Sequence, residues 1–261
     1  MNHIFILFSM LLLYHMNRNL CYTALILRSR HSGESNREVW LLSAEAGLLR
    51  ATLFGGPKSK LRAYVSPFNS GQAWIYQDPS KDSRKLSDFD VRSWRPGLRE
   101  LYERTMAADA VAETILASHG GGGHWERSLS IAESVLDALA EADAETCSRI
   151  TLCFFWLWAD FLGLMPEFDH CTLCGKTVPA DAALIYSPLE GSMICSECSA
   201  ENQHGIETSP GCRRWLETIR LLSPAQLARY TLDKKSFREA KALTTGILAE
   251  ALGKRLVSWD W

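Results

Sequence analysis

The sequence predicts an α+β protein: a small β-barrel in the N-terminal part, then a mostly helical C-terminal part into which a four-cysteine zinc ribbon is inserted. Three observations support this prediction. Short, partly alternating apolar segments fill the N-terminal part, helical apolar spacing fills the rest, and two CxxC pairs interrupt the helical series. With 261 residues and 47% hydrophobic content, the chain can bury the core of one large domain or two small ones.

Strands are expected at residues 22–27, 38–42, 48–54, 73–77 and 85–91, which are short apolar segments separated by Gly, Ser, Asn and Pro clusters. Such short strands and turns favour a small barrel. Pro96-Gly97 then marks a break where the apolar periodicity changes. We therefore expect two domains, at residues 17–95 and 96–261.

Helices are expected where apolar residues recur three to five positions apart, at residues 98–115, 129–140, 150–164, 212–222 and 236–256. The third of these is apolar nearly all round and rich in Phe and Trp. Because it is about fifteen residues long and contains Asp160, we expect a buried core helix and no membrane span. Four glycines, Gly120 to Gly123, predict a loop between the first two helices.

The first sixteen residues resemble the apolar part of a secretory signal, because Ile4 to Tyr14 is almost wholly apolar. No Lys or Arg precedes this run, and no small-x-small cleavage site follows it. We expect residues 1–16 to be a leader produced by a start assigned upstream of Met16. A signal or anchor, or a native helix, is the alternative.

Charge is distributed unevenly along the chain. The net charge is -2 and the isoelectric point is about 6.4, which argues against a polycation that coats nucleic acid. Residues 28–62, however, contain seven basic and three acidic side chains, so this stretch carries +4 and the remainder carries -6. The expected barrel is thus the basic part of the protein.

Four cysteines have the spacing of a zinc ribbon: Cys171 and Cys174, followed after twenty residues by Cys195 and Cys198. Two short turns that each offer two thiolates complete a tetrahedron around one Zn²⁺ ion, and we expect the ribbon at residues 168–200. Four reduced thiols without metal are the alternative. His170 is read as a neighbour of the site and not as a ligand.

A catalytic zinc needs an open coordination position, which four cysteines close. A deaminase would need a His-x-Glu upstream of a Pro-Cys-x-x-Cys, and the sequence contains neither. It also lacks a P-loop, a GxGxxG motif and a Ser, Cys or carboxylate pattern around its histidines. We therefore expect a protein that is not an enzyme. The other cysteines, Cys21, Cys147, Cys153 and Cys212, are expected to be buried free thiols.

The segments around these features resemble the RecO family. Gly163-Leu-Met-Pro-Glu-Phe-Asp-His-Cys171-Thr-Leu-Cys174-Gly-Lys is similar to the family's lead into the first cysteine pair, and Tyr186-Ser-Pro-Leu-Glu-Gly-Ser-Met-Ile-Cys195 to its lead into the second. Gly33-Glu-Ser-Asn-Arg37 resembles the opening strands, and Phe54-Gly-Gly-Pro-Lys58-Ser-Lys60-Leu-Arg62 the basic loop. The similarity extends from about residue 17 to about residue 256.

The resemblance implies an N-terminal OB-fold and a recombination mediator in bacterial DNA repair. Proteins of this family bind single- and double-stranded DNA and anneal complementary strands. With the partner RecR they help to load the recombinase onto DNA coated by single-strand-binding protein. The resemblance also implies a cytoplasmic, nucleoid-associated protein that has no membrane partner.

On such a barrel, phosphates would meet a basic groove. The expected DNA-binding residues are Arg37, Arg50, Lys58, Lys60 and Arg62. Aromatic side chains available for base stacking are Trp40, Phe54, Phe68 and Trp74, although aromatic residues on small barrels are more often part of the core.

Two other functions compete with this hypothesis. The first is a zinc-stabilised protein-interaction adaptor that does not bind DNA directly. The second is a zinc hydrolase or deaminase, which the closed cysteine shell disfavours. Salt dependence separates DNA binding from the adaptor, because phosphate contacts release counterions.

Overall fold

In this computed structural model, the described residues are 18–55, 60–78, 81, 83–200, 205–222, 226 and 230–259. They divide into two compact units. One contains the chain up to Trp94 together with Trp125–Leu129, and the other contains Arg95–His124 and the chain from Ser130 onward.

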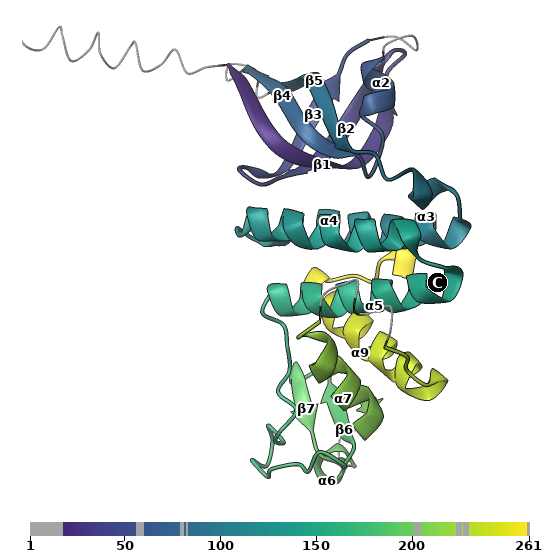
Figure 1. Cartoon of the computed structure of the whole chain (residues 1–261). Helices are drawn as coiled ribbons and strands as arrows, with labels where there is room; N and C mark the ends of the chain where they lie inside the picture. Colours follow the sequence, from purple (N-terminus) through teal and green to yellow (C-terminus); the bar gives the residue numbers. More distant parts are fainter. Residues whose placement is uncertain are drawn as a thin grey trace, which may run out of the picture. The chain divides into compact units, whose positions relative to one another are not determined.

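The N-terminal unit is a closed five-stranded barrel with the strand order β1-β2-β3-β5-β4 (Figure 1). β1 pairs antiparallel with both β2 and β4, which closes the sheet, and β3 meets β5 in parallel. The barrel predicted from the sequence is thus confirmed. Its strands are β1 (Asn19–Ser32), β2 (Asn36–Ser43), β3 (Gly47–Leu53), β4 (Ser70–Asp78) and β5 (Ser83–Ser93).

Alternate residues of these strands fill the barrel. Val39, Leu41 and Ala51 are at most 2% exposed and belong to one continuous apolar core, while the residues between them point outward. β1 extends well beyond the segment expected from the sequence. From Arg28 onward its outward side chains are charged or polar, so no alternating hydrophobic pattern marks this part of the strand, although it continues to Ser32.

The close approach of the β4 and β5 backbones explains why residue 71 is a glycine. A Cβ atom on Gly71 would lie 1.9 Å from the backbone oxygen of Asp90, so no other residue fits without a shift of the backbone. The pairing of β4 with β5 shifts register beside this residue.

Between β3 and β4 the chain forms a short helix, α2 (Leu61–Tyr64). In the described part of the predicted basic loop, the basic residues are associated with this helix. Lys60 precedes the helix and Arg62 lies in it. Lys58 lies outside the described residues.

The C-terminal unit is mostly helical, as predicted. Three of its long helices, α3, α5 and α9, pack together, with α5 contacting both of the others (Figure 1). The helical elements that follow the barrel are η1 (Pro96–Arg99), α3 (Tyr102–Ala117), η2 (His119–Gly121), α4 (Trp125–Glu141), α5 (Ala144–Phe161), α6 (Ser196–Ser199), α7 (Pro210–Ile219), α9 (Lys234–Leu252) and η3 (Val257–Trp259).

Helix α5 is the buried core helix that the sequence predicted. Trp156 and Trp158 are fully buried, and both indole N–H groups are satisfied. Trp156 donates to the backbone oxygen of Leu216 at 2.8 Å and Trp158 to the hydroxyl of Ser118 at 3.0 Å. Within the described ranges, no helix is long and apolar enough to cross a membrane.

The last long helix is shorter than expected from the sequence. α9 ends at Leu252 because Gly253 adopts φ +66°, a left-handed conformation that terminates helices. The apolar residues after this point belong to a separate 3-10 turn, in which Trp259 is buried and donates to Thr114 at 3.0 Å.

Candidate metal centre and nucleic-acid interface

The four predicted cysteines lie together in one cluster. Their sulfur atoms all lie within 4.8 Å of one another, and Cys174 and Cys195 are 3.9 Å apart. A tetrahedron with Zn–S bonds of 2.3 Å has edges of about 3.8 Å, so this spacing fits one metal ion. The cluster can therefore hold a metal, and its all-sulfur donor set fits a closed site.

The first cysteine pair lies on a tight hairpin turn. Cys171 N–H donates to the oxygen of Lys176 at 2.9 Å, and Gly175 N–H donates to the oxygen of Cys171 at 2.8 Å. Gly175 adopts φ +70°, which favours glycine at this turn. His170 and Thr177 form a β-bridge across the base of the hairpin.

The second pair follows a hairpin of β6 (Leu184–Ser187) and β7 (Ser192–Ile194), which β8 (Ile206–Thr208) extends to a three-stranded sheet. Cys195 is the N-cap of α6, and Cys198 lies within this short helix. Several contacts join the two turns, among them a backbone hydrogen bond and an ion pair. Thr172 N–H donates to the oxygen of Met193 at 3.1 Å, and the ammonium of Lys176 lies 2.5 Å from a carboxylate oxygen of Glu197.

The environment of Cys171 favours a metal-binding thiolate. Burial raises the pKa of this thiol, but hydrogen bonds from the backbone N–H groups of Cys195, Cys174 and Leu173 and from the Cys174 side chain outweigh burial and lower the pKa to about 6. A thiolate is the form that binds metal. The hydrogen bonds around Cys171 therefore favour the metal-binding form of this one ligand.

His170 is directed to carboxylates and not to the sulfur cluster. Its Nδ1 lies 2.7 Å from Asp169, and its Nε2 lies 3.4 Å from Glu167. The hydrogen bond to Asp169 raises the pKa of His170 above its ordinary value. These contacts engage both ring nitrogens away from the four thiols.

The expectation for the scattered cysteines was right in three cases and wrong in one. Cys147, Cys153 and Cys212 are buried, and burial raises the pKa of Cys147 to about 11 and that of Cys212 to about 12. Such thiols are unreactive near neutral pH. Cys21, in contrast, is exposed on β1, where its side chain contacts Gln72 at 3.2 Å.

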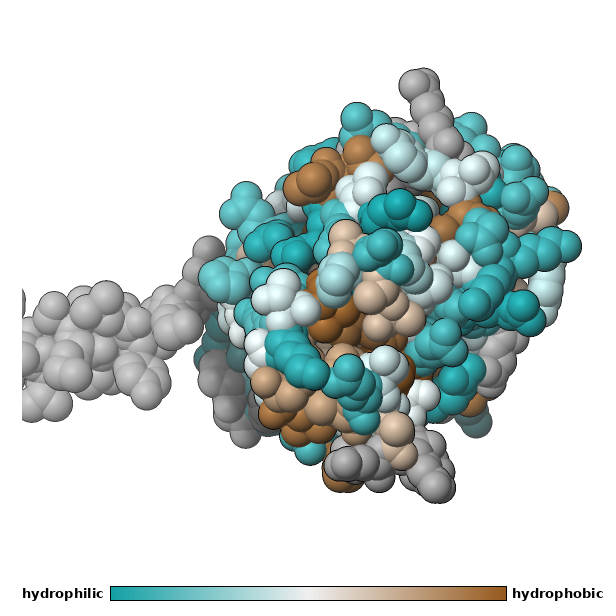
Figure 2. All heavy atoms as spheres, turned by 90° about the horizontal axis from the view of Figure 1, so that it is seen from below, coloured by the Kyte–Doolittle hydropathy of each residue, from teal (hydrophilic) through white to brown (hydrophobic). Residues whose placement is uncertain are grey.

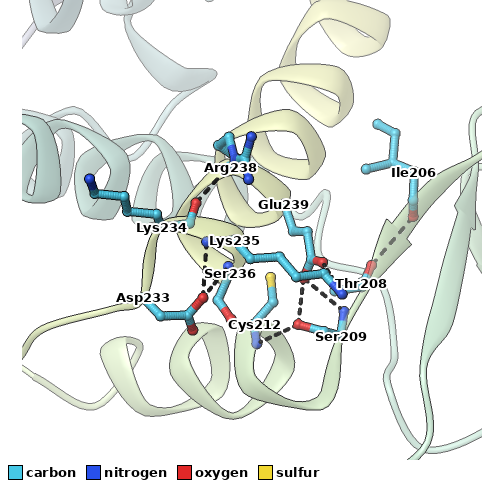
Figure 3. Close-up of polar contacts among 10 residues, drawn as sticks. All are labelled: Ile206, Thr208, Ser209, Cys212, Asp233, Lys234, Lys235, Ser236, Arg238 and Glu239. Atoms are coloured by element: carbon cyan, nitrogen blue, oxygen red, sulfur yellow. Dashed lines mark hydrogen bonds and ion pairs between the residues drawn. The ribbon is translucent and has the colours of Figure 1, made fainter.

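Polar contacts attach the ribbon to the helices. Ser209 caps α7, and its backbone N–H donates to Glu239 of α9 at 3.0 Å, while its hydroxyl contacts the same carboxylate (Figure 3). Asp233 caps α9 through bonds from the N–H groups of Lys235 and Ser236. Because Ser209 directly follows β8, these bonds fix the end of the ribbon sheet.

A cleft of about 500 Å³ lies between the N-terminal turns of α5 and α9. Its charged lining includes Arg149, Lys234 and Arg238, with Leu232 and Phe237 as apolar parts. Glu145 also lines it but pairs with Arg149 at 2.7 Å. The cleft is thus a cationic pocket with an apolar component.

On the face seen in Figure 2, hydrophobic residues lie in separate patches among hydrophilic ones.

The basic residues predicted for DNA do not all share one surface of the barrel. Arg50 lies opposite Trp40 and points outward, whereas Arg37 lies opposite Leu53, a core residue, and points to the inner side. Arg50 is exposed and pairs with Glu38. Arg37 is half-buried. Lys60 and Arg62 lie at α2, with Lys60 exposed.

Among the aromatic residues considered for base stacking, Phe68 is buried, which is the commoner outcome expected for small barrels. It is 5% exposed and adopts φ +72°, so it is unavailable to a base. Phe54 is 52% exposed, with Lys85 over its ring at 5.6 Å. Arg30 and Arg50 both lie over Trp40, at 5.8 and 5.7 Å. The sequence analysis named neither Arg30 nor Lys85 as a DNA-binding residue, although strand alternation places both outward.

These features define a class of protein: an OB-type barrel joined to a helical domain that contains a four-cysteine cluster. Comparisons with known proteins identify the family. Residues 16–93 match the family described as Recombination protein O N terminal, and residues 99–260 match Recombination protein O C terminal. The chain belongs to the RecO family of DNA repair proteins, which are recombination mediators and not enzymes.

Several curated relatives carry the description DNA repair protein RecO. That of Desulfitobacterium hafniense strain DCB-2 is 29% identical over 91% of this chain and 86% of its own length. The Pelotomaculum thermopropionicum protein is 30% identical over 80% of this chain and 78% of its own. The Myxococcus xanthus protein is 29% identical over 91% of this chain and 94% of its own.

One buried arginine connects the ribbon to α7. Arg213 is 4% exposed and donates to backbone oxygens on both sides of the first cysteine hairpin. Its acceptors are Phe168, Pro179 at 3.0 Å and Ala182 at 2.7 Å. It is therefore part of the fold and unavailable to a phosphate.

We expect Arg213→Ala to lower the free energy of unfolding by about 2–4 kcal/mol, because it leaves buried carbonyl groups without donors. Arg214→Ala changes the exposed neighbour on the same helix and should cost less than about 0.5 kcal/mol. Chemical denaturation of both variants checks this. Equal effects would show that Arg213 does not hold the ribbon.

Proposed function

We propose that this chain is a DNA-binding mediator that anneals complementary strands and, with RecR and single-strand-binding protein, helps to load recombinase onto single-stranded DNA. Membership of the RecO family carries this proposal. We assign DNA contact to residues 17–95 and the helical, ribbon-bearing domain to residues 96–261. The working place of such a protein is the cytoplasm, on the nucleoid.

We propose that Arg37, Arg50, Lys58, Lys60 and Arg62 supply the phosphate contacts. The exposed Lys60 at α2 and the exposed Arg50 on β3 support this assignment, because solvent-facing cations on an OB barrel can meet a backbone that runs across it. Such contacts position DNA without reading its sequence.

Replacing Lys58, Lys60 and Arg62 together with Ala should weaken binding to single strands and duplex alike, because each lost phosphate contact releases fewer counterions. The salt slope should flatten by about 0.7 per contact on single strands and about 0.9 on duplex. Titrations at several salt concentrations measure this, with zinc content and thermal unfolding as folding controls. Unchanged affinity and slope in the folded variant would move the phosphate site elsewhere, and a slope near zero in the wild type would favour the adaptor.

We propose that Cys171, Cys174, Cys195 and Cys198 bind one structural Zn²⁺ per chain. The sulfur spacing and the lowered pKa of Cys171 support this, and four thiolates leave no position for a substrate. When bound, the ion supplies folding free energy and no chemistry.

Metal analysis of protein purified without chelator should find about one zinc per chain, and Cys174→Ser should impair folding and metal retention. Cys21→Ser, at an exposed thiol outside the cluster, is the matched control and should retain the metal. Zinc removal should broaden the unfolding transition of the helical domain, because site closure contributes to its stability. Negligible zinc together with four titratable thiols in folded wild-type protein would contradict the proposal.

We further propose that the cleft between α5 and α9 contacts single-strand-binding protein. Within the part of the chain that the structure describes, Lys234 and Arg238 form no ion pair. Phe237 adds an apolar surface beside them. This combination fits an acidic protein segment that also carries an apolar side chain.

Lys234→Glu with Arg238→Glu should weaken binding of single-strand-binding protein by at least about tenfold, because reversed charges at an interface repel an acidic segment. Lys235→Glu is the matched control, since Lys235 pairs with Glu239 and does not line the cleft. Calorimetry without DNA measures both. Equal affinities for the two variants would place this partner on another surface.

A further inference from the structure

The outward residues of β1, β2 and β3 form one wall of the barrel. Trp40 on β2 lies opposite Arg28 on β1 and opposite Arg50 on β3. Arg30 lies opposite Glu38, two residues before Trp40. Because opposed residues of antiparallel strands share a face, these side chains all project from the same side of the sheet.

This wall, which we call the outer wall, carries an excess of positive charge. It contains Arg28, Arg30 and Arg50, together with Lys85 of β5, which neighbours Thr52 of β3. The outer wall also contains the carboxylate of Glu38, which pairs with Arg50. These four cations and one anion give a net charge of +3. An anionic partner is therefore favoured on this surface.

Two aromatic rings lie among these cations. Arg30 and Arg50 lie over the indole of Trp40, 5.8 and 5.7 Å from its centroid. Phe54, directly after β3, is 52% exposed, and Lys85 lies 5.6 Å from its ring. Flat rings beside cations offer stacking surfaces for bases together with donors for phosphates.

One further aromatic side chain of the barrel lies in different surroundings. Trp74 on β4 points outward, but it lies opposite Asp88 on β5 and Cys21 on β1. A carboxylate beside the ring repels a phosphate backbone. Trp74 is therefore an outward aromatic side chain of the same barrel that lies beside an anion and not among cations. Its replacement serves as the control.

We propose that the outer wall is a stacking surface for single-stranded DNA, on which bases stack against Trp40 and Phe54 while Arg30, Arg50 and Lys85 contact the flanking phosphates. This rests on the proposed DNA-binding function and deepens it. Stacking on a side chain requires unpaired bases, so this wall selects single strands, whereas cations near α2 contact the phosphates of either form.

Binding of labelled oligothymidylate and of a duplex to the full chain tests the proposal. Trp40→Ala and Phe54→Ala should each weaken oligothymidylate binding by roughly 5- to 150-fold, the range found for lost base stacking. Duplex affinity should change by less than about twofold, and the salt slope should stay constant because no charge is removed. Trp40→Phe should retain most of the affinity, and Trp74→Ala should behave as the wild type.

Thermal unfolding and zinc content show whether each variant is folded, and Trp40→Phe and Phe54→Ala keep the test decisive if Trp40→Ala is not. Equal losses on oligothymidylate and duplex, or unchanged oligothymidylate affinity, would overturn the stacking surface while leaving the proposed function intact. Failure of the wild type to bind either DNA would overturn both. Tight binding of an acidic protein that DNA cannot displace would instead make the wall a protein-docking surface.

Discussion

Closure of the five-stranded barrel is the constraint on which the DNA-binding account depends. Once β1 pairs with both β2 and β4, each strand residue must face either the enclosed core or the solvent. Filling the interior with Val39, Leu41 and Ala51 therefore fixes the outward direction of Trp40 and Arg50. Core packing and the chemistry of the outer wall are two consequences of one alternating pattern.

In the C-terminal unit, the ribbon needs stabilising contacts besides its own core, because its three strands are short and enclose little apolar surface. Backbone N–H groups stabilise the Cys171 thiolate, the four sulfurs converge, and buried side chains connect the ribbon to its helices. Arg213 and Glu239 make these connections to backbone groups and to a helix cap. We propose that the cluster supports the fold, as expected of a mediator that acts through binding.

Local sequence patterns predicted most helices and strands and the cysteine cluster. The burial of single side chains depends on tertiary pairing, which the local patterns do not contain. The strands, the core helix α5 and the convergence of the cysteines follow from periodicity and spacing within short segments. The burial of Arg213 and the exposure of Cys21 do not, because each depends on what a distant segment places beside it. The separation of Arg37 from Arg50 was in principle readable, since two residues of paired strands share a face only in the correct register.

We propose that this RecO-family chain binds single-stranded DNA largely through its phosphates. The most direct measurement is the affinity of the intact wild-type protein for oligothymidylate over a series of salt concentrations. The account predicts a linear decrease of log affinity with log salt, with a slope of about -0.7 for each phosphate contact. A slope near zero, or no binding at low salt, would contradict it.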